Sequence, residues 1–148
     1  MSQDNLVSIS ISAEDDQAIT DALQVLQDKL QPYLIALTPD DRRKLPKMSN
    51  RTIPFVQKSL EYAETNTQFA PVFVDIPEMK KDVEAVNKLT QYFRIIDELH
   101  EHLDDTVMLA GSEAYVAALA FYNSVKLASK MKQQGAEPIY DDLKERFK

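Results

Sequence analysis

The chain lacks cysteine and tryptophan, and its glycines are confined to Gly111 and Gly135. Without cysteine there is no disulfide, no thiolate metal site and no cysteine nucleophile. Sandwiches and barrels need a tight turn every few residues, so two glycines in 148 residues argue against an all-β fold. No G-x-S-x-G, glycine-rich phosphate loop, H-E-x-x-H or EF-hand motif occurs. We therefore expect no enzyme, no catalytic residue and no cofactor.

Targeting signals are also missing. The first five residues contain Asp4 but no lysine or arginine, and no apolar run follows them, so we expect no secretory signal. No stretch approaches the length of about 18 apolar residues that a membrane span needs. The sequence therefore predicts a cytoplasmic protein.

The charge balance is acidic, with 17 basic and 24 acidic residues and a net charge of −7. A net negative surface argues against a general nucleic-acid binder or a binder of anionic membranes. The 44% of hydrophobic residues and the length suit one domain with a core. We expect a single domain over 13–148. Residues 1–12, where Val7, Ile9 and Ile11 alternate with serines, are expected to form an extended arm that lies on the domain or pairs with another chain.

The first helix is expected to begin after Ser12, a good N-cap followed by three acids. Its apolar residues recur every three or four positions from Ile19 to Leu37. Pro32 falls inside this pattern and predicts a kink or break between Asp28 and Pro32. Thr38 with Pro39 predicts a restart, and hence a short helix over about 39–45.

A third segment is expected to be helical over about 53–65, capped by Thr52 or Asn50. Residues 66–75 form an unusually apolar loop, which we expect to cap the open end of the core or else to be an exposed partner surface. Asp75, Pro77 and Glu78 then predict a helix start. The helix that follows carries one apolar stripe: Met79, Val83, Val86, Leu89, Phe93, Ile96, Leu99 and Leu103.

A further helix is expected over about 105–132, and its small residues include Ala110, Ala114 and Ala118. We expect Ala114 and Ala118 to lie at a close helix contact. Gly135 occupies the place of a helix terminator, and Pro138 opens a last short helix over 138–147. The sequence thus predicts an all-α fold: an up-down-up-down four-helix bundle with short extra helices at about 39–45 and 138–147.

Three stretches resemble an uncharacterised family of short bacterial helical proteins. The resemblance covers nearly all of the chain from Ser12 onward and implies a helical fold, with no activity to transfer. It rests on Asp41–Met48, on Leu109–Tyr115 continuing through Ala120–Lys126, and on Ile139–Leu143 with Arg146 and Phe147.

Two charged clusters are candidates for function. The acidic cluster spans Asp97–Asp105 and contains both histidines, His100 and His102; a helix would place Asp97, His100 and Asp104 on one face, as a metal site requires. Di-iron bundles need a carboxylate-x-x-His motif on each of two helices, and two histidines in one segment cannot supply it. We therefore interpret the acidic cluster as a solvated helix end and expect no metal.

The basic cluster spans Arg42–Arg51 and consists of Arg42, Arg43, Lys44, Lys47 and Arg51. It is interpreted as solvated or internally paired, with an anion or acidic partner as the alternative. In an up-down-up-down bundle both clusters would lie at the same end, so we expect Arg43 near Asp104.

Tyr115, Tyr122, Asn123 and Ser124 place polar groups on an alanine-rich helix, with Glu113 nearby. We expect a hydrogen-bond network between helices or, alternatively, the lining of a small pocket. The sequence predicts a non-catalytic helical bundle that acts through protein contacts, with another protein or with itself as a homodimer. The alternative is a bundle that holds a small ligand or metal between its helices.

Overall fold

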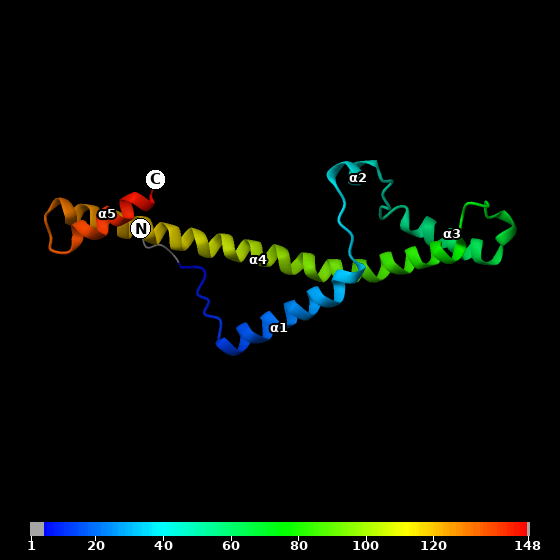
Figure 1. Cartoon of the computed structure of the whole chain (residues 1–148), viewed down its shortest axis with the longest axis horizontal. Helices are drawn as coiled ribbons and strands as arrows, with labels where there is room; N and C mark the ends of the chain where they lie inside the picture. Colours follow the sequence, from blue (N-terminus) through cyan, green and yellow to red (C-terminus); the bar gives the residue numbers. More distant parts are fainter. Residues whose placement is uncertain (1–4, 148) are drawn as a thin grey trace. The chain divides into compact units, whose positions relative to one another are not determined.

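The computed structural model describes residues 5–147, which form five α-helices and two 3-10 helices with no strand among them (Figure 1). The predicted all-α fold is confirmed. The chain divides into two compact units, and the division falls within the longest helix. The N-terminal unit comprises Ile11–Ile96, and the C-terminal unit joins the residues before Ile11 to those from Asp97 onward.

Local capping starts α1 in the N-terminal unit. α1 spans Ala13–Leu30, and the Ser12 Oγ accepts a hydrogen bond from the Asp15 backbone N–H at 3.0 Å. The predicted break at Pro32 is confirmed, because α1 gives way to the 3-10 helix η1 over Gln31–Tyr33. The predicted stripe does not continue as a helix to Leu37, since residues 34–38 are neither helix nor strand.

The short helix α2 spans Pro39–Lys44 and also begins at a side-chain cap. Thr38 accepts from the Asp41 backbone N–H at 3.1 Å through its Oγ1, which satisfies one of the unpaired donors of the first turn. After α2 ends, the Lys47 Nζ donates to the Arg42 carbonyl at 2.7 Å. A cation at this position also suits the negative end of the helix dipole.

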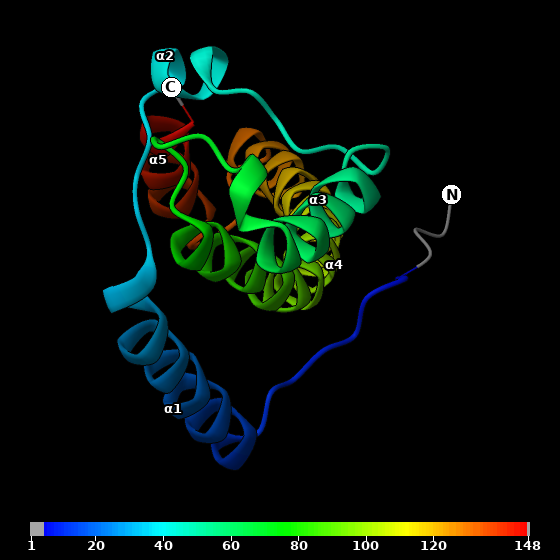
Figure 2. The ribbon, with the colours of Figure 1, turned by 90° about the vertical axis from the view of Figure 1, so that its right-hand side faces the viewer.

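α3 spans Ile53–Thr65, which are the predicted bounds. Thr52, one of the two predicted caps, is the N-cap residue, but it makes no side-chain capping bond; its Oγ1 instead donates to the Ser49 carbonyl at 3.0 Å in the turn before the helix. In two views, α3 lies alongside the first part of α4 (Figure 1; Figure 2).

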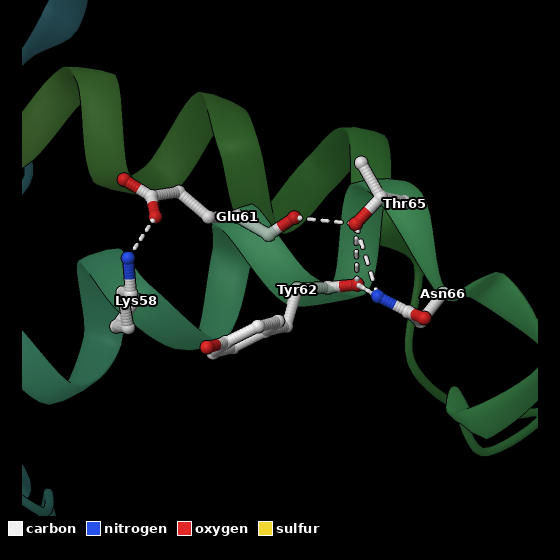
Figure 3. Close-up of polar contacts among 5 residues, drawn as sticks. All are labelled: Lys58, Glu61, Tyr62, Thr65 and Asn66. Carbon is white, nitrogen blue, oxygen red and sulfur yellow. Dashed lines mark hydrogen bonds and ion pairs between the residues drawn. The ribbon is translucent and has the colours of Figure 1, made fainter.

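Side chains close the C-terminal end of α3 (Figure 3). The Asn66 side-chain amide donates to the Tyr62 carbonyl at 3.0 Å, and the Thr65 Oγ1 donates to the Glu61 carbonyl at 3.3 Å. These side-chain bonds add to the backbone bonds of the last turn, where the Asn66 backbone N–H also donates to the Tyr62 carbonyl at 2.8 Å. The chain then turns through the 3-10 helix η2 over Thr67–Phe69 into an irregular loop.

The second half of the chain contains one helix where the sequence predicts two. α4 spans Ile76–Lys130, and the Asp75 Oδ1 accepts from the Glu78 backbone N–H at 3.1 Å at its start. The predicted reversal between 103 and 105 is wrong, so the chain does not turn between these two predicted helices. No glycine or proline interrupts residues 97–110, and the Thr106 Oγ1 donates to the His102 carbonyl at 2.6 Å. The Thr106 hydroxyl therefore bonds back to the preceding turn of the same helix, which continues through this position.

The end of α4 uses Lys132 as its left-handed residue. Lys132 has φ 58°, the Gln133 N–H bonds the Ala128 carbonyl at 2.9 Å, and the Lys132 N–H bonds the Ser129 carbonyl at 3.0 Å. This is the Schellman pattern, in which the left-handed position usually holds glycine. The prediction that Gly135 terminates this helix is therefore wrong: Gly135, with φ 85°, instead precedes α5, which spans Ala136–Arg146.

Candidate interaction surfaces

Few apolar side chains are buried in either unit. Among residues 5–147, the buried apolar residues are Leu60 in α3, Val125 in α4 and Ala136 in α5. Removing apolar surface from water is the main favourable term in folding and in most protein association. The apolar helix faces described below remain exposed to water, so burying them against a partner would still be favourable.

One group of exposed apolar residues in the N-terminal unit lies on α3 and the loop after it, and we name it the hairpin patch: Phe55, Tyr62, Phe69, Val72 and Phe73. Phe69 and Phe73 are 79% and 89% exposed, and Phe55 and Tyr62 are also exposed. A hollow of about 730 Å³ lies beside them between α3, the loop and Met79 of α4. The expectation that the loop caps the core is wrong, and the alternative of an exposed apolar surface is confirmed.

The apolar stripe of α1 also lies open in the same unit. Ile19, Leu23 and Leu26 are exposed, and α1 buries no residue. Near its C-terminal end, Leu30 and Leu26 line a hollow of about 610 Å³ with Leu89 and Tyr92 of α4. A helix with one apolar face is expected to bury that face against a neighbour.

The C-terminal unit is organised by aromatic packing between α4 and α5. The ring of Tyr122 stacks on Phe147 with centroids 5.2 Å apart and planes within 7°, and it lies 5.8 Å from the Tyr140 ring. Partial burial raises the pKa of the Tyr122 phenol, and the neighbouring Tyr140 hydroxyl acts in the same direction. A hollow of about 200 Å³ lies beside this stack, and Arg146 is at its rim.

Glu113 has a role that the sequence did not reveal. Its Oε1 accepts from the Leu6 backbone N–H at 2.6 Å, and its Oε2 accepts from the Val7 N–H at 3.3 Å. With its side-chain amide nitrogen turned toward the carboxylate, Asn5 donates to the Glu113 Oε2 at 2.7 Å. One carboxylate thus holds residues 5–7 of the predicted arm against α4; residues 1–4 of that arm lie outside the described residues. Only the lone carboxylate at position 113 could have hinted at this contact.

The predicted polar cluster is not assembled into one pocket. Tyr122 lies against α5, Asn123 is exposed, and Glu113 binds the arm. The expected close contact at Ala114 and Ala118 is also wrong, because both residues are exposed. Ala118 instead lines the open hollow beside α5, together with Phe147.

The acidic cluster is exposed along α4. Its acids are Asp97, Glu98, Glu101, Asp104 and Asp105, and none of them forms an ion pair with a residue in the described range 5–147. Asp97, His100 and Asp104 are not brought together as a metal site: within that range, no group of three histidine or acidic residues could hold a metal ion.

The basic cluster is partly paired within its own unit. Arg43 forms an ion pair with Asp40 one turn away, and Lys47 binds the carbonyls at the end of α2. Arg42, Lys44 and Arg51 are exposed. The basic and acidic clusters belong to different units, so the expected proximity of Arg43 and Asp104 stays a prediction.

The search for relatives found none: no family model, curated protein or solved structure matches the chain. The resemblance to a family of short bacterial helical proteins therefore stays a prediction. Over residues 5–147, no helix has the length and apolar character needed to cross a membrane.

Proposed function

We propose that this chain is a non-catalytic helical protein that acts by binding another protein chain through its apolar helix faces. One observation carries the proposal: the hairpin patch, the α1 stripe and much of α4 expose large apolar side chains, whereas three apolar residues are buried in the described range. Large contiguous apolar patches on soluble proteins mark interaction surfaces. The net charge of −7 supports a protein partner in preference to nucleic acid or an anionic membrane.

The predicted four-helix bundle and the cytoplasmic, bacterial setting belong to this proposal. α4 is one continuous helix over Ile76–Lys130, where the predicted bundle has two. A bundle would therefore take some of its helices from a partner. Such an interface would pack the apolar faces of helices from the two chains together, as the helices of a bundle pack around their common core.

Site-specific photo-crosslinking in cells tests the proposal. A benzophenone amino acid at Phe73, which is 89% exposed, should yield discrete protein adducts. The matched control is the same amino acid at Lys58, an exposed polar position of α3 in the same unit. Equal or absent adducts at the two positions would contradict the proposal.

A second candidate function is binding of a small ligand in the C-terminal unit. It is favoured by the 200 Å³ hollow, whose lining includes Tyr122, Phe147 and the cationic Arg146. Apolar walls with one polar group are typical of ligand pockets, although this hollow is smaller than most. A screen of planar aromatic carboxylates by NMR tests it. Binding should shift the Tyr122 ring resonances, and no shift at millimolar ligand would exclude this class.

A further inference from the structure

The part of α4 in the C-terminal unit carries a heptad repeat. Writing His100 as position a, the a and d positions repeat every seven residues, with spacings of three and four. We name these residues the α4 seam: His100, Leu103, Val107, Ala110, Ala114, Ala117 and Phe121. All but the histidine are apolar, and a sustained a/d pattern of this kind is typical of a coiled coil.

The α4 seam is uncovered. Leu103, Val107 and Phe121 are 64%, 68% and 57% exposed. α5 stacks on Tyr122 and the arm binds Glu113, and neither residue is a seam position, although Phe121 lines the 200 Å³ hollow together with Phe147 of α5. The seam is therefore open at Leu103 and Val107, and the arm at Glu113 and α5 at Tyr122 flank it farther along α4.

The same register continues upstream in the sequence of α4. Phe93 and Ile96 occupy the preceding a and d positions, and they are 65% and 38% exposed. Val86 and Leu89 occupy the positions one heptad earlier, where Leu89 also lines the hollow beside α1. A repeat that runs for five heptads is long enough to specify a coiled coil.

The residue types on the seam favour a second copy of this chain. Within the seam, Val107 at an a position and Leu103 at a d position are the pairing of residue types that favours two strands. In a dimer, the exposed apolar surface of Leu103, Val107 and Phe121 would be removed from water in both copies.

Charge selects the orientation of the two helices. In a parallel coiled coil, e positions face the g positions of the partner, so Asp97 and Asp104 meet the uncharged side chains of Tyr92 and Leu99. In an antiparallel pairing centred on the acidic cluster, e positions face e positions, so Asp97 would meet Asp104. Like charges at this distance repel, and the parallel arrangement avoids that contact.

We propose that two copies of this chain associate through a parallel, in-register coiled coil along the α4 seam, with His100 of each copy at the same a position. The proposal rests on the proposed function and names its partner. A polar residue at one a position fixes register at a cost in stability. Replacing that residue by leucine should therefore tighten the dimer.

Sedimentation equilibrium of the full chain tests the association with a matched pair of variants. Val107 and Met108 are adjacent and almost equally exposed, at 68% and 66%, but only Val107 lies on the seam. The wild type should dimerise, and Val107→Asp should raise the dimer Kd by more than about tenfold, because it buries unpaired charge. Met108→Asp should leave the Kd within about twofold. A monomeric wild type, or equal effects of the two variants, would overturn the proposal.

Disulfide trapping tests the orientation, since the chain has no cysteine of its own. Leu103→Cys places two thiols at facing d positions of a parallel dimer, and it should yield a disulfide-linked dimer under mild oxidation. Met108→Cys is the control and should yield little. If Leu103→Cys stays monomeric, the parallel register is wrong. If photo-crosslinking at Val107 captures only a different protein, the homodimer is refuted while the proposed function stands.

Discussion

Removal of the Glu113 carboxylate should release the N-terminal arm from α4. The two backbone N–H groups of Leu6 and Val7 both donate to this carboxylate, at 2.6 and 3.3 Å. Hydrogen bonds to charged groups contribute about 1.5–3 kcal/mol each when buried. The Leu6 bond is exposed and the Val7 bond is long, so we expect about 1–2 kcal/mol for the pair.

Amide hydrogen exchange measured by NMR reports this contact directly. In Glu113→Ala, exchange at Leu6 and Val7 should accelerate by about 5- to 30-fold, because tenfold corresponds to 1.4 kcal/mol. The Asp15 N–H, which Ser12 caps at 3.0 Å, is an internal control and should not change. Glu113→Gln keeps one acceptor oxygen without the charge and should give an intermediate acceleration.

An unchanged exchange rate at Leu6 and Val7 in Glu113→Ala would refute the reasoning, because it would mean that the carboxylate does not hold the arm in solution. Acceleration that extends equally to Asp15 would also refute it, since the variant would then loosen the chain generally and not the clamp.

Three further predictions concern stability. Lys132→Gly should stabilise the α4–α5 connection by about 1 kcal/mol, because a left-handed conformation costs a lysine about 1–2 kcal/mol that glycine avoids; a thermal melt that moves downward would contradict this. Because the pKa of Tyr122 is raised on folding, the folded state keeps a proton that the unfolded state loses, and the free energy of unfolding should fall as pH rises above about 10. Urea unfolding at pH 8 and above pH 10 measures this fall. Tyr122→Phe should make the fall smaller. Phe73→Ser should change the free energy of unfolding by less than about 0.5 kcal/mol, because Phe73 is 89% exposed. A large loss of stability would show that the loop is packed.

The features that were predicted from the sequence are those that neighbouring residues determine. Ser12, Thr38 and Asp75 each bond a backbone N–H three residues ahead, so three helix starts lie where capping predicts them. Pro32 likewise ends α1 through its own geometry. These signals need no knowledge of what packs where.

The features that were missed depend on contacts distant in sequence or on competition between nearby groups. The contact between Glu113 and Leu6 spans 107 residues and leaves no periodic trace. A new helix was expected near residue 105 because the composition changes there, but the Thr106 hydroxyl donates to the His102 carbonyl and α4 continues through it. Lys132 occupies a position that usually holds glycine, so the end of α4 was assigned to Gly135. The exposed loop was expected to be covered because its composition is apolar.

The net negative charge of the protein should prevent association of molecules through the exposed hairpin patch. Phe69 and Phe73 present aromatic surface to water on every molecule, and a net charge of −7 keeps those molecules apart at neutral pH. Near the isoelectric point of about 4.8 that repulsion vanishes while the aromatic surface remains. Solutions of this protein should therefore be clear at neutral pH and low salt and become turbid as the pH approaches 5, through contacts that have no fixed stoichiometry.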